Sequence, residues 1–325
     1  MTVFLIRRLI QATIVLAAMS FLVFVGVFAI GNPADILVSP EATQIERQAV
    51  IERFGLDQPW WVQYARFLWR AAHGDMGDSF RHATPAVSLI LERFPATLEL
   101  AILAMVMAVV LGIPLGLLAG IRSQSLIGRL IMGFSILGFS VPTFWVGLIM
   151  IMVFSAYLGL LPSFGRGPTV TVLGIPISLL SLDGLRHALM PAVNLALFKI
   201  SLVIRLTRSG VDEVLLSDFV KFARARGLSN GRIVGVHILK NILIPVVTIL
   251  GIQFGSLLAF SVVTETIFSW PGIGKLLIES ITHLDRPVVV AYLMMSVLLF
   301  TLVNLLVDIA YSLLDPRIRL EGLGE

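Results

Sequence analysis

Residues 218–245, DFVKFARARGLSNGRIVGVHILKNILIP, contain the residue types best suited to binding chemistry in this chain. The segment has one acid, Asp218, and strongly apolar sequence on both sides. Its basic residues are Lys221, Arg224, Arg226, Arg232 and Lys240. These charges cannot lie in hydrocarbon, and basic loops concentrate on the cytoplasmic side of membrane proteins. The pattern therefore predicts a cytoplasmic surface that binds a partner without covalent chemistry.

Helix signals divide this basic segment into two elements. Helical spacing over 218–226 predicts a short amphipathic helix. The residues that this helix brings near one another are Phe219, Phe222, Ala223 and Arg226. Gly227 is expected to end the helix, because glycine accepts the left-handed conformation, and Ser229 can cap a second helix from about Gly231. An ordinary basic loop is the alternative interpretation.

The composition indicates that these elements belong to a membrane protein. The chain is 57% hydrophobic and 14% charged, whereas a soluble domain has roughly 25% charged residues. The net charge of +4 is better explained by cytoplasmic loops than by nucleic acid. The absence of cysteine excludes disulfides, thiolate metal sites and cysteine nucleophiles. The sequence therefore predicts an all-α integral membrane protein whose surroundings are the lipid bilayer.

Six segments reach the roughly 20 apolar residues that a membrane helix needs. They are residues 9–31, 98–121, 130–159, 188–207, 243–268 and 288–314. The first follows Arg7 and Arg8 without a small-residue cleavage site, as expected of a retained signal anchor. Just over half of the Lys and Arg residues then lie on the inner side, in the shorter loops. We expect a multi-pass inner-membrane protein with both termini in the cytoplasm.

The first outer loop is expected to be helical. Residues 45–56 and 59–72 both show apolar residues at helical spacing. The aromatic residues suited to a membrane interface are Trp60, Trp61, Tyr64 and Trp69. These helices either rest on the bilayer or help to receive a delivery protein. The expected domains are residues 1–97, the first membrane helix with its periplasmic loop, and 98–325, the core of the other membrane helices with a cytoplasmic loop at about 208–242.

Polar residues inside two apolar segments leave two interpretations open. On the fifth segment Gln253, Ser256, Phe260 and Thr264 fall on one narrow stripe. Such a stripe either lines a conduit or forms interhelical hydrogen bonds. Lys199, in the fourth segment, needs a partner or a wet cavity. It could bind a peptide carboxylate, and a structural ion pair explains it equally well.

Sequence motifs along nearly the whole chain resemble one transporter family. Ala223, Gly227 and the helix after them resemble the cytoplasmic signature loop of ABC importer permeases. Other motifs are LDQPWWVQY (56–64), GDMGDS (74–79), RFPATLEL (93–100), SVPTFW (140–145), RHALMPA (186–192), ETIFSWPGIGKLL (265–277) and LDPRIR (314–319). In this order they are similar to the first permease subunit of dipeptide, oligopeptide and nickel importers.

The resemblance implies a type I importer permease fold with six transmembrane helices and import of peptides by alternating access. It implies a heterodimer with a second permease, two ABC ATPase subunits and an extracytoplasmic substrate-binding protein. The residues implied in ATPase coupling are Asp218, Lys221, Phe222, Ala223, Arg226, Gly227, Leu228 and Ser229. The wider superfamily has a glutamate where this chain has Lys221, and a proline where it has Lys240.

The chemistry of ATP is expected to come from those partners. No GxxxxGK[ST] motif occurs, and GIPLGLLAG (112–120) lacks the lysine that would reach phosphates. The scattered histidines do not suggest a metal site. We therefore expect no enzyme activity and no cofactor in this chain, with ATP and Mg on the ATPases. Nickel chelates or glutathione are alternative substrates, and a secondary transporter is the rival class.

Overall fold

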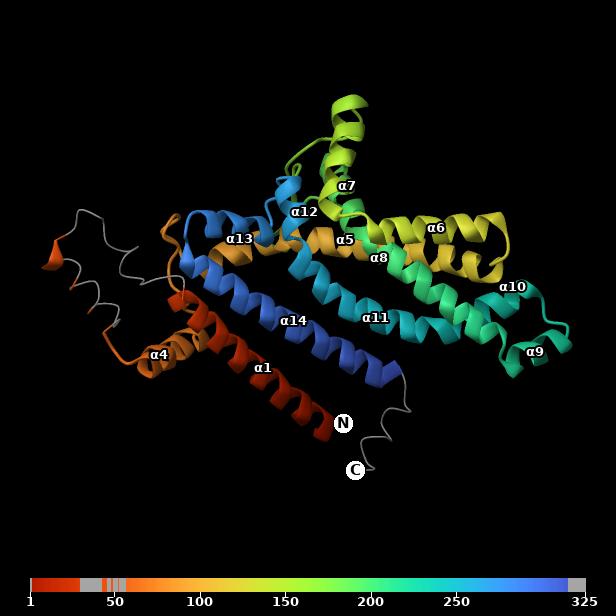
Figure 1. Cartoon of the computed structure of the whole chain (residues 1–325), viewed down its shortest axis with the longest axis horizontal. Helices are drawn as coiled ribbons and strands as arrows, with labels where there is room; N and C mark the ends of the chain where they lie inside the picture. The colour runs from red at the N-terminus through yellow and green to blue at the C-terminus, as the bar shows by residue number, and fades with distance from the viewer. Residues whose placement is uncertain (1, 30–42, 46–47, 49–51, 53–56, 315–325) are drawn as a thin grey trace. The chain divides into compact units, whose positions relative to one another are not determined.

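The computed structural model describes residues 2–29, 43–45, 48, 52 and 57–314 (Figure 1). Most of the helix predicted over 45–56 lies outside the described residues. The α-helices are α1 (Thr2–Ala29), α4 (Trp60–Ala72), α5 (Ala86–Ile121), α6 (Leu126–Ser140), α7 (Thr143–Met150), α8 (Leu182–Leu215), α9 (Asp218–Ala225), α10 (Asn230–Arg232), α11 (Leu239–Phe260), α12 (Val262–Ile267), α13 (Ile273–Thr282) and α14 (Arg286–Leu314). Two π-helical segments, η1 (Ile151–Tyr157) and η2 (Ile233–Ile238), and two short strands, β1 (Val170–Val172) and β2 (Ile175–Ile177), complete the described chain.

Long apolar helices confirm the all-α membrane class. Four described helices are long and apolar enough to cross a membrane, and the number is six if each of two bent pairs forms one span. The four are Ile6–Gly26, Ala86–Ile121, Leu182–Leu215 and Arg286–Val307. The bent pairs are Leu126–Ser140 with Thr143–Tyr157, and Asn230–Leu243 with Pro245–Leu258.

The prediction of one continuous helix over 130–159 is wrong. The chain turns by 104° between α6 and α7. Pro142 is the cause, because a proline ring pushes the residue before it out of the helical region. Val141 accordingly has φ −84° and ψ 131°.

The single helix expected over 243–268 is also interrupted. α11 ends at Phe260, and Thr264 lies on the short helix α12 instead. Between them the Ser261 hydroxyl donates to the Leu258 carbonyl at 3.1 Å. Side-chain bonds of this kind compete with the helical ladder and bend helices. The predicted stripe is therefore split between two helices.

The chain divides into two compact units. One contains Met1–Arg93 and Leu276–Thr301, and the other contains Phe94–Lys275 and Leu302–Glu325. In the first unit α1 contacts α4 through a 2.9 Å hydrogen bond between the Ser20 and Tyr64 hydroxyls. The domain boundary expected after residue 97 stays a prediction.

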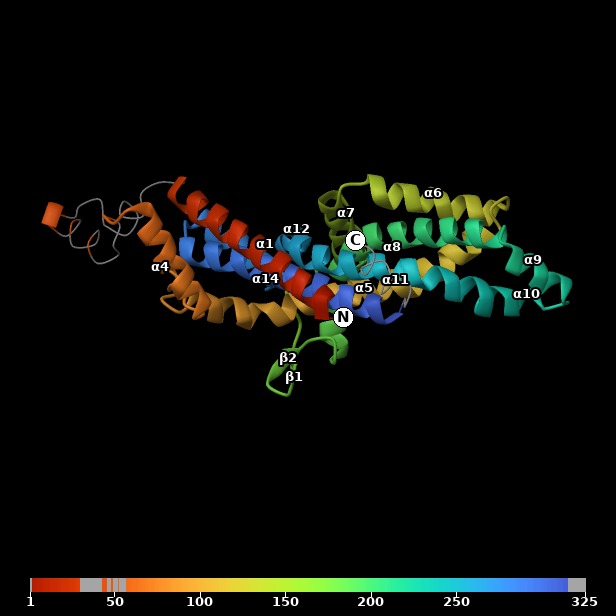
Figure 2. The same ribbon diagram turned by 90° about the horizontal axis from the view of Figure 1, so that it is seen from below.

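Strands β1 and β2 form an antiparallel hairpin in the second unit (Figure 2). Leu173 and Gly174 occupy the turn, both with positive φ, at 52° and 81°. Two-residue hairpin turns of this conformation match the twist of the strands. Leu173 is 98% exposed at the tip.

Three glycines let α5 and α8 pack closely in the second unit. A Cβ atom added at Gly112, Gly116 or Gly120 would lie within 2.5–2.7 Å of a side chain on α8. The tightest is Gly116, where the added atom would be 2.5 Å from Thr207 Cβ and 2.8 Å from the Ile204 carbonyl oxygen. Small residues at a four-residue spacing allow this approach between membrane helices.

Gly116→Val is expected to lower the thermal unfolding midpoint of the purified protein in detergent. The added side chain must separate α5 from α8, and overpacking of this kind costs about 1–3 kcal/mol. Gly133→Val on α6 is the matched control, because nothing lies within 4 Å of a Cβ added there. Equal shifts for the two variants would contradict close packing at Gly116.

Candidate functional site

A compact turn joins α9 to α10, as the glycine position predicts. Gly227 has φ +75°. Its N–H donates to the Arg224 carbonyl at 2.9 Å, and the Leu228 N–H donates to the Ala223 carbonyl at 3.2 Å. These two bonds define a Schellman motif, which satisfies the free carbonyls at a helix end. In Figure 1 this turn follows α8 and leads into α11.

The second helix of the segment begins where the sequence indicates. Ser229 holds the N-cap position of α10, with φ −62° and ψ 147°. Its side chain makes no capping hydrogen bond, so this part of the prediction is wrong. The Ser229 backbone carbonyl instead accepts the N–H groups of Arg232 and Ile233, each at 3.0 Å.

One face of α9 is fixed to the rest of the second unit. Val220 and Ala223 are buried, at 0% and 5% exposure. They belong to an apolar cluster with Val211, Ile233, Ile238 and Ile242. The cluster joins α9 to α8, η2 and α11. A force on α9 is therefore transmitted to the long helices through direct side-chain packing.

The other face of α9 is exposed, and we call it the α9 surface. Its members are Asp218, Phe219, Lys221, Phe222, Arg224 and Arg226. Phe219 is 44% exposed and Phe222 is 61% exposed. The Arg226 guanidinium lies 4.9 Å from the centroid of the Phe222 ring. Aromatic and arginine side chains in contact are typical of protein interfaces.

Among the described residues, the α9 surface forms one ion pair, and it is exposed. The Lys221 ammonium contacts the Asp218 carboxylate at 2.9 Å, and the two side chains are 64% and 97% exposed. Such exposed pairs contribute little to stability. Lys221 therefore remains able to contact an acidic partner. The coupling role of these residues stays a prediction.

The residues of the predicted pathway make contacts with α8. The Lys199 ammonium donates to Gln253 Oε1 at 2.5 Å and to Ser256 Oγ at 2.8 Å. The Asn194 amide donates to Thr264 Oγ1 at 2.9 Å. Phe260 differs from these residues, because it is 77% exposed. The contacts favour a role in joining helices for Gln253, Ser256 and Thr264, and the pathway assignment stays a prediction.

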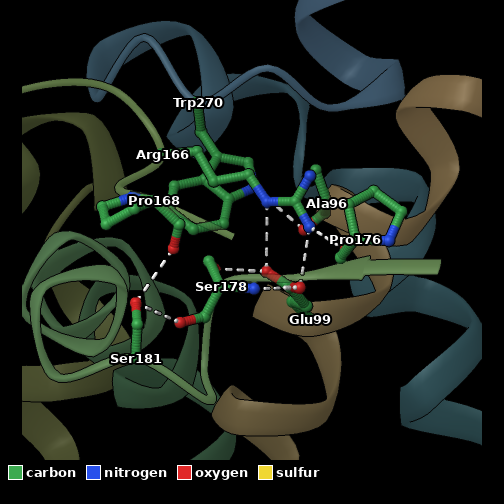
Figure 3. Close-up of polar contacts among 8 residues, drawn as sticks. All are labelled: Ala96, Glu99, Arg166, Pro168, Pro176, Ser178, Ser181 and Trp270. Atoms are coloured by element: carbon green, nitrogen blue, oxygen red, sulfur yellow. Dashed lines mark hydrogen bonds and ion pairs between the residues drawn. The ribbon is translucent and has the colours of Figure 1, made fainter. Parts of the chain in front are cut away.

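A buried ion pair between Glu99 and Arg166 is absent from the sequence-based predictions (Figure 3). Arg166 Nη2 contacts Glu99 Oε1 at 2.7 Å, and the side chains are 10% and 8% exposed. The Ser178 backbone N–H and hydroxyl donate to the same carboxylate at 2.8 and 2.6 Å. Arg166 also donates to the Pro176 carbonyl. This group of contacts fixes the β1–β2 hairpin to α5. The one sign of it in the sequence is Glu99, a charged residue at the start of the apolar segment 98–121.

A second buried carboxylate, Glu265, organises the WPGIG turn. It accepts hydrogen bonds from the Thr97 hydroxyl at 2.7 Å and from the Lys275 backbone N–H at 3.0 Å. A Cβ atom at Gly272 would lie 2.4 Å from the Glu265 carboxyl carbon. The Trp270 indole donates to the Ala96 carbonyl at 2.8 Å. The glycine is therefore needed for space around the carboxylate, and the WPGIG turn is held to α5 at Ala96 and Thr97.

Comparison with known proteins places these features in a family. The family profile of the binding-protein-dependent transport system inner membrane component matches residues 112–320. The profile of the corresponding N-terminal membrane component matches residues 1–101. Together they span almost all of the chain.

Individual relatives agree with these profiles. The dipeptide transport system permease protein DppB of Escherichia coli strain K12 is 37% identical over 333 residues, covering 97% of this chain and 98% of the relative. The di/tripeptide transport system permease protein DppB of Pseudomonas aeruginosa strain UCBPP-PA14 is 41% identical over 302 residues, covering 89% and 90%.

A solved structure shares the fold. It is the MetNI methionine ABC transporter in an inward-facing conformation, with a TM-score of 0.54 and 18% identity. The match covers 70% of this chain and 96% of that chain. The importer permease fold implied by the sequence motifs is confirmed. This chain belongs to the family of inner-membrane components of binding-protein-dependent transport systems.

Proposed function

We propose that this chain is a permease subunit of an ATP-driven importer that carries di- or oligopeptides across the inner membrane. It pairs with a second, non-identical permease. Two ABC ATPase subunits bind on the cytoplasmic side, and a substrate-binding protein delivers the peptide from outside. ATP and Mg are bound by the ATPases. The peptide assignment is supported by the dipeptide and di/tripeptide permeases that are similar over most of this chain.

The observation that carries this proposal is the two-sided character of α9. Its buried side is packed on α8, η2 and α11, while its other side exposes Phe219, Phe222 and Arg226. A groove on each ATPase with an apolar floor and an acidic rim would complement this surface. When ATP closes the ATPase dimer, the grooves displace α9, and α8 and α11 move with it. ATP can drive this change only because it binds the closed state more tightly.

The orientation follows from the same surface. If each bent pair is one span, the chain crosses the membrane six times, so both termini share one side. The basic α9 surface then lies on the cytoplasmic side with them. The β1–β2 hairpin lies on the opposite, outer side.

Single-cysteine labelling tests the docking surface, because the natural chain has no cysteine. Phe222→Cys on α9 is expected to react with a thiol reagent from the cytoplasmic side and to be protected when the ATPases are bound. Leu173→Cys, at the exposed hairpin tip, is the control and should react only from the outside, with or without ATPases. Equal reactivity of Phe222→Cys in the two states would reject α9 as the docking element.

The rival substrates and the rival class are also distinguishable. A glutathione or nickel-chelate importer would show ATP-driven uptake of that solute and none of peptides. A secondary transporter would show uptake driven by an ion gradient without ATPases. The α9 surface favours the ATPase-linked class, because a secondary transporter has no use for a cytoplasmic docking element.

A further inference from the structure

Lys199 is a buried cation in the middle of a membrane-spanning helix. It lies 17 residues after the start of α8, which is about 25 Å along the axis. The residue is 8% exposed. Arg205, the next basic residue, is about 9 Å further along the axis. A lysine side chain at this depth cannot easily reach water at the membrane surface.

The described contacts of the Lys199 ammonium are to uncharged groups. Gln253 Oε1 and Ser256 Oγ accept from it, at 2.5 and 2.8 Å. The Phe198 ring centroid is 5.3 Å from the ammonium. Among the described side chains no carboxylate lies within ion-pair distance, 4.0 Å, of Lys199. The structural ion pair, one of the two explanations left open by the sequence, is not formed by these side chains.

The two acceptors hold the ammonium in one place but do not neutralise it. An ammonium group has three N–H donors, and two are used here. An uncompensated charge inside a membrane protein is costly, and such residues generally pair or mark a substrate path. Gln253 and Ser256 each present an oxygen atom that accepts a hydrogen bond from the Lys199 ammonium. Among the described side chains, the arrangement leaves one N–H donor of the Lys199 ammonium without a hydrogen-bond acceptor.

We propose that Lys199, held by Gln253 and Ser256, binds a carboxylate that comes from outside this chain. The inference rests on the proposed function, since it places the site inside a permease that carries peptides. The carboxylate belongs either to the C-terminus of the transported peptide or to an acidic side chain of the second permease. In both cases the Lys199 ammonium recognises the carboxylate by its charge and by a charge-assisted hydrogen bond.

The experiment compares Lys199→Met with the wild type in the assembled complex, reconstituted in proteoliposomes with its binding protein. Each complex is offered one peptide with a free C-terminal carboxylate and the same peptide as a C-terminal amide. Occupancy of the binding protein by each peptide is measured separately, and uptake is normalised to the wild type. Lys199→Arg keeps the charge and is the matched control.

If the transported peptide supplies the carboxylate, Lys199→Met lowers uptake of the free-acid peptide about tenfold, the equivalent of 1.4 kcal/mol. Uptake of the amide peptide then changes little. If the second permease supplies it, both peptides are affected equally and less of that subunit co-purifies. Lys199→Arg is expected to give the wild-type result in either case, because it keeps the positive charge. Lys199→Gln replaces the methionine variant if the latter does not fold, because glutamine can still bond to Gln253 and Ser256.

Two results would overturn the proposal. One is Lys199→Met assembling and transporting both peptides at the wild-type rate. The other concerns Asp308, the one acidic residue of α14. If adding Asp308→Asn restores transport to Lys199→Met, Asp308 of this chain is the partner of Lys199. Failure of the proposed function is a separate result, because it appears as absence of ATP-driven peptide uptake in the wild type.

Discussion

Gly227→Val is expected to reduce ATP-driven uptake by at least about tenfold while the chain still inserts in the membrane. Gly227 has φ +75°, and among the described residues no atom other than those of Gly227 and its chain neighbours lies within 4 Å of a Cβ added there. The effect therefore comes from the backbone and not from a clash. A β-branched residue in this conformation is strained by about 1–3 kcal/mol. The turn between α9 and α10 is expected to open and to displace the α9 surface.

Gly231→Val provides the comparison for this substitution. Gly231 lies four residues later in the same exposed segment, also has nothing within 4 Å of an added Cβ, and does not have a positive φ. We expect it to retain transport and to co-purify with the ATPases, whereas Gly227→Val loses them or hydrolyses ATP without transport. Full transport by Gly227→Val would exclude a role for the turn in coupling.

Arg166→Met is expected to destabilise the protein by about 3–5 kcal/mol, because it leaves the Glu99 carboxylate buried without its cation. The measurement is the thermal or denaturant midpoint in detergent. Arg70→Met is the matched control. Arg70 pairs with Asp75 at 2.8 Å, but those side chains are 53% and 55% exposed, and such pairs contribute about 1 kcal/mol or less.

Charge and packing can be separated at this ion pair. Adding Glu99→Gln to Arg166→Met removes the unpaired charge while keeping an oxygen for the Ser178 N–H. The double variant is expected to recover part of the lost stability. If it is as unstable as Arg166→Met alone, the loss comes from packing of the arginine and not from the buried carboxylate.

Local signals predicted the elements that depend on neighbouring residues. Gly227 follows the end of α9 with a positive φ, a signal that acts within one turn of chain. Ser229 occupies the N-cap position of α10, although its side chain makes no capping hydrogen bond. Length and hydropathy likewise located the apolar spans. Pro142 is visible in the sequence, but the residues around it are apolar enough to be taken for one continuous helix. Hydropathy therefore does not show the bend of 104°.

Contacts between distant segments could not be predicted in this way. Glu99 and Arg166 are 67 residues apart, and each alone looks like an isolated charge. Lys199 and Gln253 are both visible as polar residues in apolar segments, but the helical phase of one segment does not show which neighbouring helix a residue faces. Tertiary packing decides such pairs, and it places the Lys199 cation against the polar side chains of Gln253 and Ser256.

ATP dependence of uptake tests the central claim most directly. The chain, assembled with its second permease, ATPases and binding protein in sealed vesicles, is given labelled dipeptide with ATP, with a non-hydrolysable analogue, or with an imposed ion gradient alone. We expect accumulation against a gradient only with hydrolysable ATP, and its loss in Gly227→Val. Accumulation driven by the ion gradient without ATP would contradict the importer assignment.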